Sequence, residues 1–319
     1  MVNGLPLFPE EQELVRILQT ERARCLWIVY AASPEIFSRY FPNLINVREN
    51  LHPTRFLRVG RYTAGIIGVN TSIVAIPGFP GDFTRDELVF FMERIQAFAL
   101  AVGARGVALA GIIPGRFYRY GIPMDPPIVS GDLGAVYTIV ETLQDALRMH
   151  GLALSTRPVR VLGYGYIGQR CIEHLRQLGC TDLVAIERRL RGTYQRRGVI
   201  FTNSLDAIRQ DDWVVFTAGG GNEIDVARLP RIFGVDDMYP PFSVDQLAMF
   251  EAKESVIFQA ALHAEGVVSN LPIEQFAEDQ FAGCMAQGLL QAAGVDTSRM
   301  TQGEFDITAR ARGIRSSLA

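Results

Sequence analysis

The most constraining stretch of the chain is VLGYGYIG at residues 161–168, near the middle of its 319 residues. Gly163, Gly165 and Gly168 have the spacing GxGxxG, after the apolar run VRVL and before the helical pattern IGQRCIEHLRQLG. A strand, a glycine turn and a helix in this order let a pyrophosphate approach the backbone at the helix N-terminus. The stretch therefore predicts a Rossmann domain that binds a dinucleotide.

An acidic residue stands where such a domain holds the ribose of its cofactor. The apolar run DLVAI is followed by Glu187, 19 residues after Gly168, and a carboxylate there can bind both ribose hydroxyls of NAD. Arg188, Arg189 and Arg191 come next, and guanidinium groups at this place can hold the 2′-phosphate of NADP. The same arginines also suit an exposed turn. We therefore predict NAD or NADP as the cofactor, with the choice between them open.

Further cofactor contacts are expected after the apolar run WVVF, in the segment TAGGG at 217–221. Its glycines would let the backbone approach a flat nicotinamide ring closely, although a flexible turn is the alternative interpretation. The residues predicted to bind the cofactor are Gly163, Tyr164, Gly165, Tyr166, Ile167, Gly168, Glu187, Arg188, Arg189, Thr217, Ala218, Gly219 and Gly220.

Apolar periodicity predicts the remaining secondary structure. Thr84 and Glu87 have capping-box spacing at the start of a helix that Gly103 would end. The other expected helices lie at 9–25, 130–151, 166–178, 204–210 and 272–293. The expected strands lie at 26–32, within 61–77, and at 106–114, 159–162, 182–187, 198–203, 213–216 and 232–237.

This order of elements predicts an α/β chain with an N-terminal substrate domain and a doubly wound Rossmann domain. The substrate domain, residues 1–154, could also form a homodimer. The Rossmann domain covers 155–270, and a C-terminal helical segment, 271–319, is expected to return to the first domain. We expect the active site in the cleft between the two domains.

Composition excludes several classes of protein. A net charge of −3 disfavours nucleic acid as a partner, and apolar stretches are too short for a membrane span. The N-terminus has no signal-peptide pattern. The four cysteines have no CxxC spacing, which predicts neither a metal site nor a disulfide framework and favours a cytoplasmic location. Lys253 is the only lysine, so a mechanism that needs a lysine depends on it.

Three stretches resemble the shikimate dehydrogenase-like architecture. They are GDLGAVYTIVETL, VDDMYPP at 235–241 and FAGCMAQGLLQAAG, which resemble that group's crossing helix, Asp-x-x-Tyr-x-Pro turn and closing helix. The group's substrate-site lysine has no counterpart here, because Lys253 lies elsewhere. The resemblance therefore implies the architecture and disfavours shikimate oxidation.

A closer resemblance is to the long-chain acyl-acyl-carrier-protein reductases. It rests on GVALAGI (106–112), GDLGAVYTI (131–139), VLGYGYIG and FAGCMAQGLL (281–290). In that family a cysteine of the last helix takes the acyl group as a thioester, and Cys284 falls on its position. The family uses NADPH, and Arg188 matches its arginine, whereas Glu187 departs from it.

The catalytic residues that we predict are Cys284 and Tyr239. Cys284 would be the nucleophile, although a cysteine among small apolar residues is also a common packing residue. Tyr239, or backbone N–H groups near Gly219–Gly221, would bind the developing oxyanion. Arg116 and Tyr118, in IPGRFYRYG, together with Asp132, are the predicted substrate-binding residues, with a surface loop as the alternative for IPGRFYRYG.

Three hypotheses of function follow. The first is reduction of an acyl thioester, from a small molecule or an acyl carrier, to an aldehyde through Cys284. The second is direct hydride transfer on a small ketone/alcohol or imine/amine, with no covalent intermediate. The third is a non-catalytic protein that binds or senses a dinucleotide.

Overall fold

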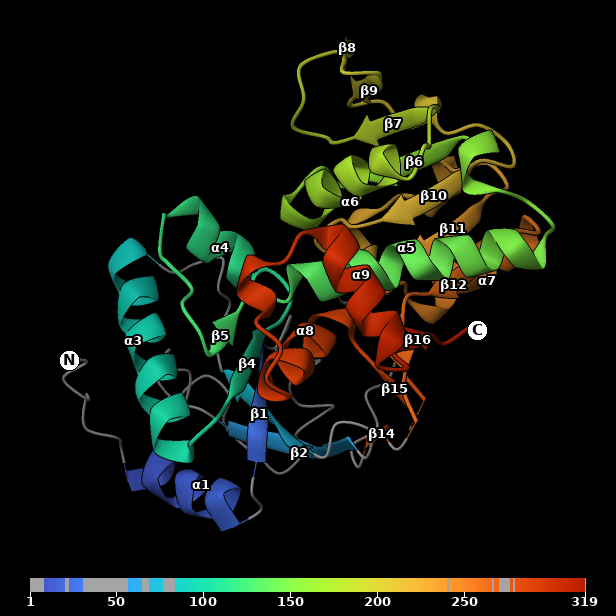
Figure 1. Cartoon of the computed structure of the whole chain (residues 1–319). Coiled ribbons are helices and arrows are strands. Elements are labelled where there is room, and N and C mark those ends of the chain that lie inside the picture. The colour runs from blue at the N-terminus through green and yellow to red at the C-terminus, as the bar shows by residue number, and fades with distance from the viewer. Residues whose placement is uncertain are drawn as a thin grey trace. The chain divides into compact units, whose positions relative to one another are not determined.

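The chain is described by a computed structural model for residues 9–20, 23–30, 57–64, 69–76, 84–239, 241–265, 267–269, 276–277 and 279–318. It divides into two compact units (Figure 1). Unit 1 contains the described residues up to Gly134 and His263–Ile314, and unit 2 contains Ala135–Leu262 and the described residues from Arg315. The first change of unit lies within one helix, α5 (Asp132–Met149), whereas the sequence placed the boundary after residue 154.

Unit 1 contains a mixed sheet whose described strands have the order β14–β2–β3–β1–β4–β5. Strand β1 runs parallel to β3 and β4, while β2 is antiparallel to β3 and β14. The bounds are β1 (Ala23–Tyr30), β2 (Leu57–Ala64), β3 (Val69–Ile76), β4 (Gly106–Leu109), β5 (Ile128–Val129) and β14 (Val267–Ser269). The strand expected at 26–32 is confirmed over residues 26–30 of β1, and residues 31–32 lie outside the described residues. The region 61–77 contains the end of β2 and the whole of β3.

The helices of unit 1 include one whose ends the sequence predicted. Helix α3 (Arg85–Val102) begins with the expected capping box, in which the Thr84 hydroxyl accepts from Glu87 N and the Glu87 carboxylate accepts from Thr84 N. Gly103 ends it with φ 76°. The other helices are α1 (Pro9–Thr20), α4 (Ile113–Arg119), α8 (Gly283–Ala292), α9 (Gln302–Ala311) and the 3-10 turn η5 (Thr297–Arg299).

Four expectations in this unit need correction. The helix expected over 9–25 ends at Thr20, and residues 23–25 belong to β1. The strand expected over 106–114 ends at Leu109, and residues 113–114 belong to α4. The segment IPGRFYRYG, for which a surface loop was the alternative, forms α4, because Pro114 fits the first turn of a helix, where no backbone donor is needed. The closing helix expected over 272–293 begins only at Gly283. Residues 276–277 are not helical, and Gln280–Phe281 form strand β15, so strand pairing overrides the helical pattern there. Residues 272–275 and 278 lie outside the described residues.

Unit 2 contains a sheet whose described strands have the order β12–β11–β10–β6–β7–β9–β8. All neighbours are parallel except the edge pair β8 and β9. The order reverses at β6, as in a doubly wound Rossmann sheet, and the predicted fold class is confirmed. The bounds are β6 (Val159–Leu162), β7 (Leu183–Ile186), β8 (Tyr194–Arg196), β9 (Val199–Thr202), β10 (Trp213–Phe216), β11 (Phe233–Asp236) and β12 (Val256–Gln259).

Helices and turns connect these strands. They are α6 (Tyr166–Gln177), α7 (Val244–Ala252) and the 3-10 turns η1 (Leu154–Thr156), η2 (Leu205–Ala207), η3 (Gly221–Glu223) and η4 (Val226–Arg228). The helix expected over 204–210 was wrong, since only η2 forms there. The Ser204 hydroxyl caps this turn by accepting from Asp206 N at 3.1 Å, but the backbone becomes extended at Ile208 (φ −88°, ψ 121°), whose side chain is buried in the core. Two short strands, β13 (Leu262–His263) and β16 (Arg315–Ser316), complete the described elements.

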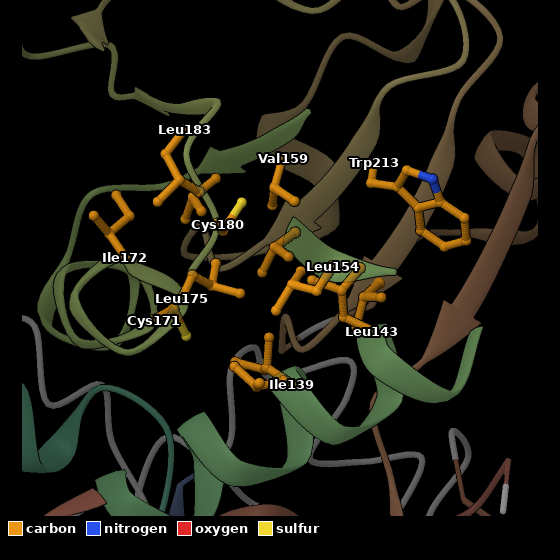
Figure 2. Packing of buried hydrophobic residues seen from close by; sticks show 14 of the residues in the cluster. Ile139, Leu143, Leu154, Val159, Cys171, Ile172, Leu175, Cys180, Leu183 and Trp213 are labelled. Carbon is orange, nitrogen blue, oxygen red and sulfur yellow. The ribbon is translucent and has the colours of Figure 1, made fainter. Parts of the chain in front are cut away.

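The core of unit 2 covers both faces of the sheet, as a parallel sheet requires. Figure 2 shows apolar side chains of α5 and α6 pointing toward the strands, among them Ile139, Leu143, Ile172 and Leu175. Cys171 and Cys180 belong to this cluster. Burial raises the pKa of the Cys171 thiol well above its ordinary value and that of Cys180 to about 11. Both thiols therefore stay protonated near neutral pH and act as packing residues.

Candidate functional site

The central strands of unit 2 end at the same level of the sheet. The last residues of β6, β7, β10 and β11 are direct neighbours in the ladders. In an open parallel sheet, ligands bind outside the carboxyl ends of the strands where the strand order reverses, which here means between β6 and β10. The residues that follow these strands, and so share this edge, are Gly163, Glu187, Thr217 and Asp237.

The three glycines of the GxGxxG segment have different surroundings. Gly163 has φ 107°, and a Cβ there would lie 2.6 Å from the backbone N of Ala218. A Cβ on Gly168 would lie 1.9 Å from the carbonyl oxygen of Gly163, so these two glycines permit the fold itself. A Cβ on Gly165 would meet no described atom within 4 Å. Gly165 therefore keeps space open beside the turn.

The start of α6 faces this open space. Gly165 is the N-cap residue, and as a glycine it has no side chain with which to cap the helix. The backbone N–H groups of the first turn of a helix favour an anion such as a pyrophosphate. The residues present therefore fit a dinucleotide, with the predicted Tyr166 and Ile167 in the first turn of α6. The Arg170 guanidinium lies over the ring of Tyr166, with its central carbon 5.0 Å from the centre of that ring.

Thr217 fixes the shape of the glycine turn. Its hydroxyl donates to the carbonyl oxygen of Gly163 at 2.7 Å, and its backbone N donates to Leu162 O at 2.9 Å. The residues after it differ in exposure, because Ala218 is half-buried, Gly219 is exposed and Gly220 is buried. A Cβ on Gly221 would lie 2.7 Å from the backbone N of Phe242, so this third glycine serves packing.

Glu187 lies against the glycine turn. One carboxylate oxygen accepts from Tyr164 N at 3.2 Å and the other from Arg189 N at 3.2 Å. Arg188 turns to another loop, where its guanidinium lies 3.1 Å from the carboxylate of Glu223. Sequence reasoning missed Glu223, since it lies 35 positions further along and has no local pattern that marks it.

Two adjacent carboxyl groups, Asp236 at the end of β11 and Asp237 after it, lie at the same edge; the sequence analysis named their segment, VDDMYPP, but gave neither of them a role. Asp236 is buried and accepts from Met238 N at 2.9 Å, and burial raises its pKa to about 7. Asp237 is half-buried, and burial together with the charge of Asp236 raises its pKa well above the ordinary value. The pair of acidic residues directly after an apolar strand was the signal in the sequence. Tyr239 follows, half-buried in the turn after β11.

Replacement of Asp236 by Asn is expected to change how stability depends on pH. Because its folded pKa, about 7, lies above the ordinary 3.8, the folded chain holds a proton that the unfolded chain has lost between these values. The free energy of unfolding should therefore fall as pH rises from about 4 to about 7. Asp236→Asn should remove a decline on the order of 2–3 kcal/mol between pH 5 and pH 7. Urea unfolding at both pH values measures it, and parallel pH curves for the two proteins would contradict it.

Cys284 is the second residue of α8 in unit 1. Its sulfur accepts a hydrogen bond from the indole Nε1 of Trp27 at 3.2 Å. Cys25, Cys171 and Cys180 are buried, whereas Cys284 is half-buried. Trp27, only 6% exposed, comes from β1 and was missed by the sequence analysis. The contact joins residues 257 positions apart, so no local pattern could reveal it.

The packing of α8 on the sheet sets the position of Cys284. Trp27 and Cys25 share a face of β1 because they are two residues apart, and Cys284 and Gly288 share a face of α8 because they are four apart. A Cβ on Gly288 would lie 3.3 Å from the Cys25 sulfur. A Cβ on Gly131 would lie 2.6 Å from that of Cys284. Close contacts on both sides therefore hold the thiol at this point.

The three predicted substrate-binding residues lie in different surroundings. Asp132 is buried at the start of α5 and accepts from the Ser130 hydroxyl. Arg116 is half-buried in α4, and Tyr118 is 68% exposed on the same helix. Asp132 therefore stabilises the start of its own helix, while α4 presents Tyr118 to solvent.

Lys253 has a structural role. Its Nζ donates to the carbonyl oxygens of Val226, Ala227 and Leu229 at 2.8, 2.9 and 2.6 Å. The ammonium group thus satisfies the carbonyls of the η4 turn. A mechanism that needs a catalytic lysine has no candidate, because Lys253 is the only lysine in the sequence.

No described helix is long and apolar enough to cross a membrane. No three His, Cys, Asp or Glu side chains gather as metal ligands among the described residues.

No protein-family model matches the chain, and no curated protein matches it. Among solved structures it is similar to malic enzyme from Entamoeba histolytica, with a TM-score of 0.53 and 11% identity over 96% of this chain and 67% of that one. It is also similar to glutamate dehydrogenase 2 of Plasmodium falciparum, with a TM-score of 0.48 and 11% identity over 91% of this chain and 70% of that one. A third similar structure is shikimate dehydrogenase 1 from Peptoclostridium difficile, with a TM-score of 0.43 and 11% identity over 74% of this chain and 85% of that one. At such identities the likeness concerns the fold.

The chain therefore has the fold of the two-domain Rossmann-type dehydrogenases. The resemblance to acyl-acyl-carrier-protein reductases stays a prediction.

Proposed function

We propose that this protein is an NAD(P)-dependent oxidoreductase that reduces an acyl thioester to an aldehyde through Cys284. The observation that carries the choice of chemistry is the environment of Cys284, a half-buried thiol that accepts the Trp27 indole N–H in the first turn of a helix. The glycine turn and Glu187 support binding of the cofactor. The similarity to dehydrogenases and a malic enzyme also supports it.

The sulfur of Cys284 would begin the reaction as a thiolate. A thiolate is the reactive form of cysteine, and N–H donors and the positive end of a helix dipole stabilise it. It attacks the carbonyl carbon of the substrate thioester and expels the substrate's own sulfur, which leaves as a thiol after taking up a proton. The acyl group is then bound to Cys284 as a new thioester.

When bound, the reduced cofactor supplies the hydride that reduces this thioester by two electrons. The carbonyl oxygen then carries negative charge and needs hydrogen-bond donors. Tyr239 and the backbone N–H groups of Gly219–Gly221 are the donors we propose. Breaking the bond between carbon and the Cys284 sulfur then releases the aldehyde and regenerates the thiolate.

We assign substrate recognition to unit 1. Arg116 and Tyr118 of α4 would bind the polar part of the thioester, such as a carboxylate or the phosphate of a phosphopantetheine arm. Arginine suits this role because its planar donors match carboxylate and phosphate oxygens. Asp132 would act by holding the start of α5.

Replacement of Trp27 by Phe is expected to slow alkylation of Cys284. Phe keeps the apolar ring but removes the N–H that stabilises the thiolate, a bond worth on the order of 1 kcal/mol. The rate of iodoacetamide alkylation at pH 7, followed by mass spectrometry of the Cys284 peptide, should fall by about fivefold. Trp213→Phe, at the chain's other tryptophan, serves as the control and should alkylate like the wild type. Equal rates in all three proteins would contradict the role of Trp27.

The function is tested by turnover. Purified protein with NADH or NADPH and a series of acyl-CoA and acyl-carrier thioesters should oxidise the cofactor, measured by absorbance at 340 nm, and release an equal amount of aldehyde. Turnover of ketones or imines, with none of thioesters, would favour direct hydride transfer. Binding of the cofactor with no turnover of any of these substrates would favour a sensing role.

A further inference from the structure

We infer that Glu223 selects NAD over NADP by holding Arg188 away from the 2′ position of the adenosine ribose. The inference rests on the dinucleotide site proposed above and goes beyond it, because it settles a choice that the residues after β7 leave open. It assigns a specificity role to a residue of the loop after β10.

The first step concerns the position of the Glu187 carboxylate. It follows β7 directly and is held by the backbone N–H groups of Tyr164 and Arg189, both at 3.2 Å. A carboxylate fixed at this end of the strand suits two ribose hydroxyls as donors. A 2′-phosphate would bring further negative charge against it, which is unfavourable at short range.

The second step concerns Arg188, the first of the arginines that follow Glu187. Its guanidinium lies 3.1 Å from the carboxylate of Glu223. This ion pair neutralises the cation and fixes its direction. Glu223 also lies beside Gly219, since a Cβ there would be 3.1 Å from the Glu223 carboxylate. A larger residue at 219 would meet that carboxylate, so the exposed glycine leaves Glu223 room in this position.

The third step is the charge that a 2′-phosphate would meet. Arg188 lies next to Glu187 in the chain, and its partner Glu223 carries a second carboxylate. With Arg188 engaged by Glu223, a phosphate at this place faces two acidic groups, and the arginine next to Glu187 already has a partner. Loss of the Glu223 charge would free Arg188 to bind the phosphate as a charge-assisted donor.

The test is a double-mutant cycle read by binding. Isothermal titration calorimetry at low salt measures the Kd of NAD⁺ and NADP⁺ for the wild type, Glu223→Gln, Arg188→Ala and the double variant. Wild type should bind NAD⁺ at least about tenfold more tightly than NADP⁺. Because the ion pair is exposed, Glu223→Gln should narrow that ratio by about three- to fivefold, through tighter binding of NADP⁺. The gain should vanish in the double variant.

Glu254→Gln is the matched control. Glu254 also pairs with an arginine, Arg231, at 3.5 Å, but this pair lies just before β11 and β12, at the amino ends of the strands. Its replacement should leave both Kd values unchanged. A wild type that prefers NADP⁺, or a ratio that Glu223→Gln does not change, would overturn the inference and leave the dinucleotide site standing. Binding of neither nucleotide by the wild type would instead refute the site itself.

Discussion

Cys284→Ala should form no acyl adduct and should lose thioester reduction by at least about a thousandfold, because removing a covalent nucleophile removes the step on which turnover depends. Intact-protein mass after incubation with acyl-CoA and acyl-carrier thioesters, without cofactor, measures the adduct. The wild type should gain the mass of one acyl group. Addition of NADH or NADPH should discharge it as aldehyde.

The fold should survive this change, so a loss of activity can be assigned to chemistry. Cys284 is half-buried, and its loss should cost at most about 1 kcal/mol of the free energy of unfolding. Cys284→Ser is the matched variant, since its hydroxyl keeps an acceptor for the Trp27 indole but is a much weaker nucleophile. An adduct on either variant would place the nucleophile elsewhere. Unchanged hydride transfer in both would show that no covalent intermediate forms on Cys284.

The parts of the fold that the sequence predicted are those with local causes. The capping box at Thr84 and the alternation of short apolar runs with helices depend on neighbouring residues, and α3 and the Rossmann sheet followed the prediction. The helix expected over 204–210 stops after Ala207, where Ile208 takes an extended conformation with its side chain in the core, a tertiary contact that periodicity does not reveal. The closing helix began late because Gln280–Phe281 pair as a strand, which periodicity alone does not reveal.

In the candidate site, too, the sequence revealed the residues with local causes, and only the structure revealed the others. The glycine turn and Glu187 could be read from spacing, because their roles follow from one βαβ unit. Trp27 and Glu223 could not, since each meets its partner through the tertiary fold. Lys253 also needed the structure, because only the three carbonyls around its ammonium group show that it is structural.

Gly165→Ala is expected to weaken dinucleotide binding while leaving the fold intact. The residue has φ −78°, which alanine adopts, and an added Cβ meets no described atom within 4 Å. Loss of glycine at an N-cap costs a few tenths of a kcal/mol or more, and the reduced entropy of the unfolded chain offsets this. The methyl group would, however, occupy the space where a pyrophosphate approaches the turn. Calorimetry should show NAD⁺ binding weakened by at least about tenfold.

Two other glycines make the result decisive. Gly168→Ala places a Cβ 1.9 Å from the Gly163 carbonyl oxygen, so it should lower the free energy of unfolding by several kcal/mol and lose binding as a consequence. Gly303→Ala, in α9, has open space and should change neither binding nor folding adversely. Only Gly165→Ala should separate stability from binding, with urea unfolding close to that of the wild type and NAD⁺ binding weakened. Wild-type affinity in Gly165→Ala would mean that no pyrophosphate lies on this turn, because the space that the glycine keeps open would then serve no ligand.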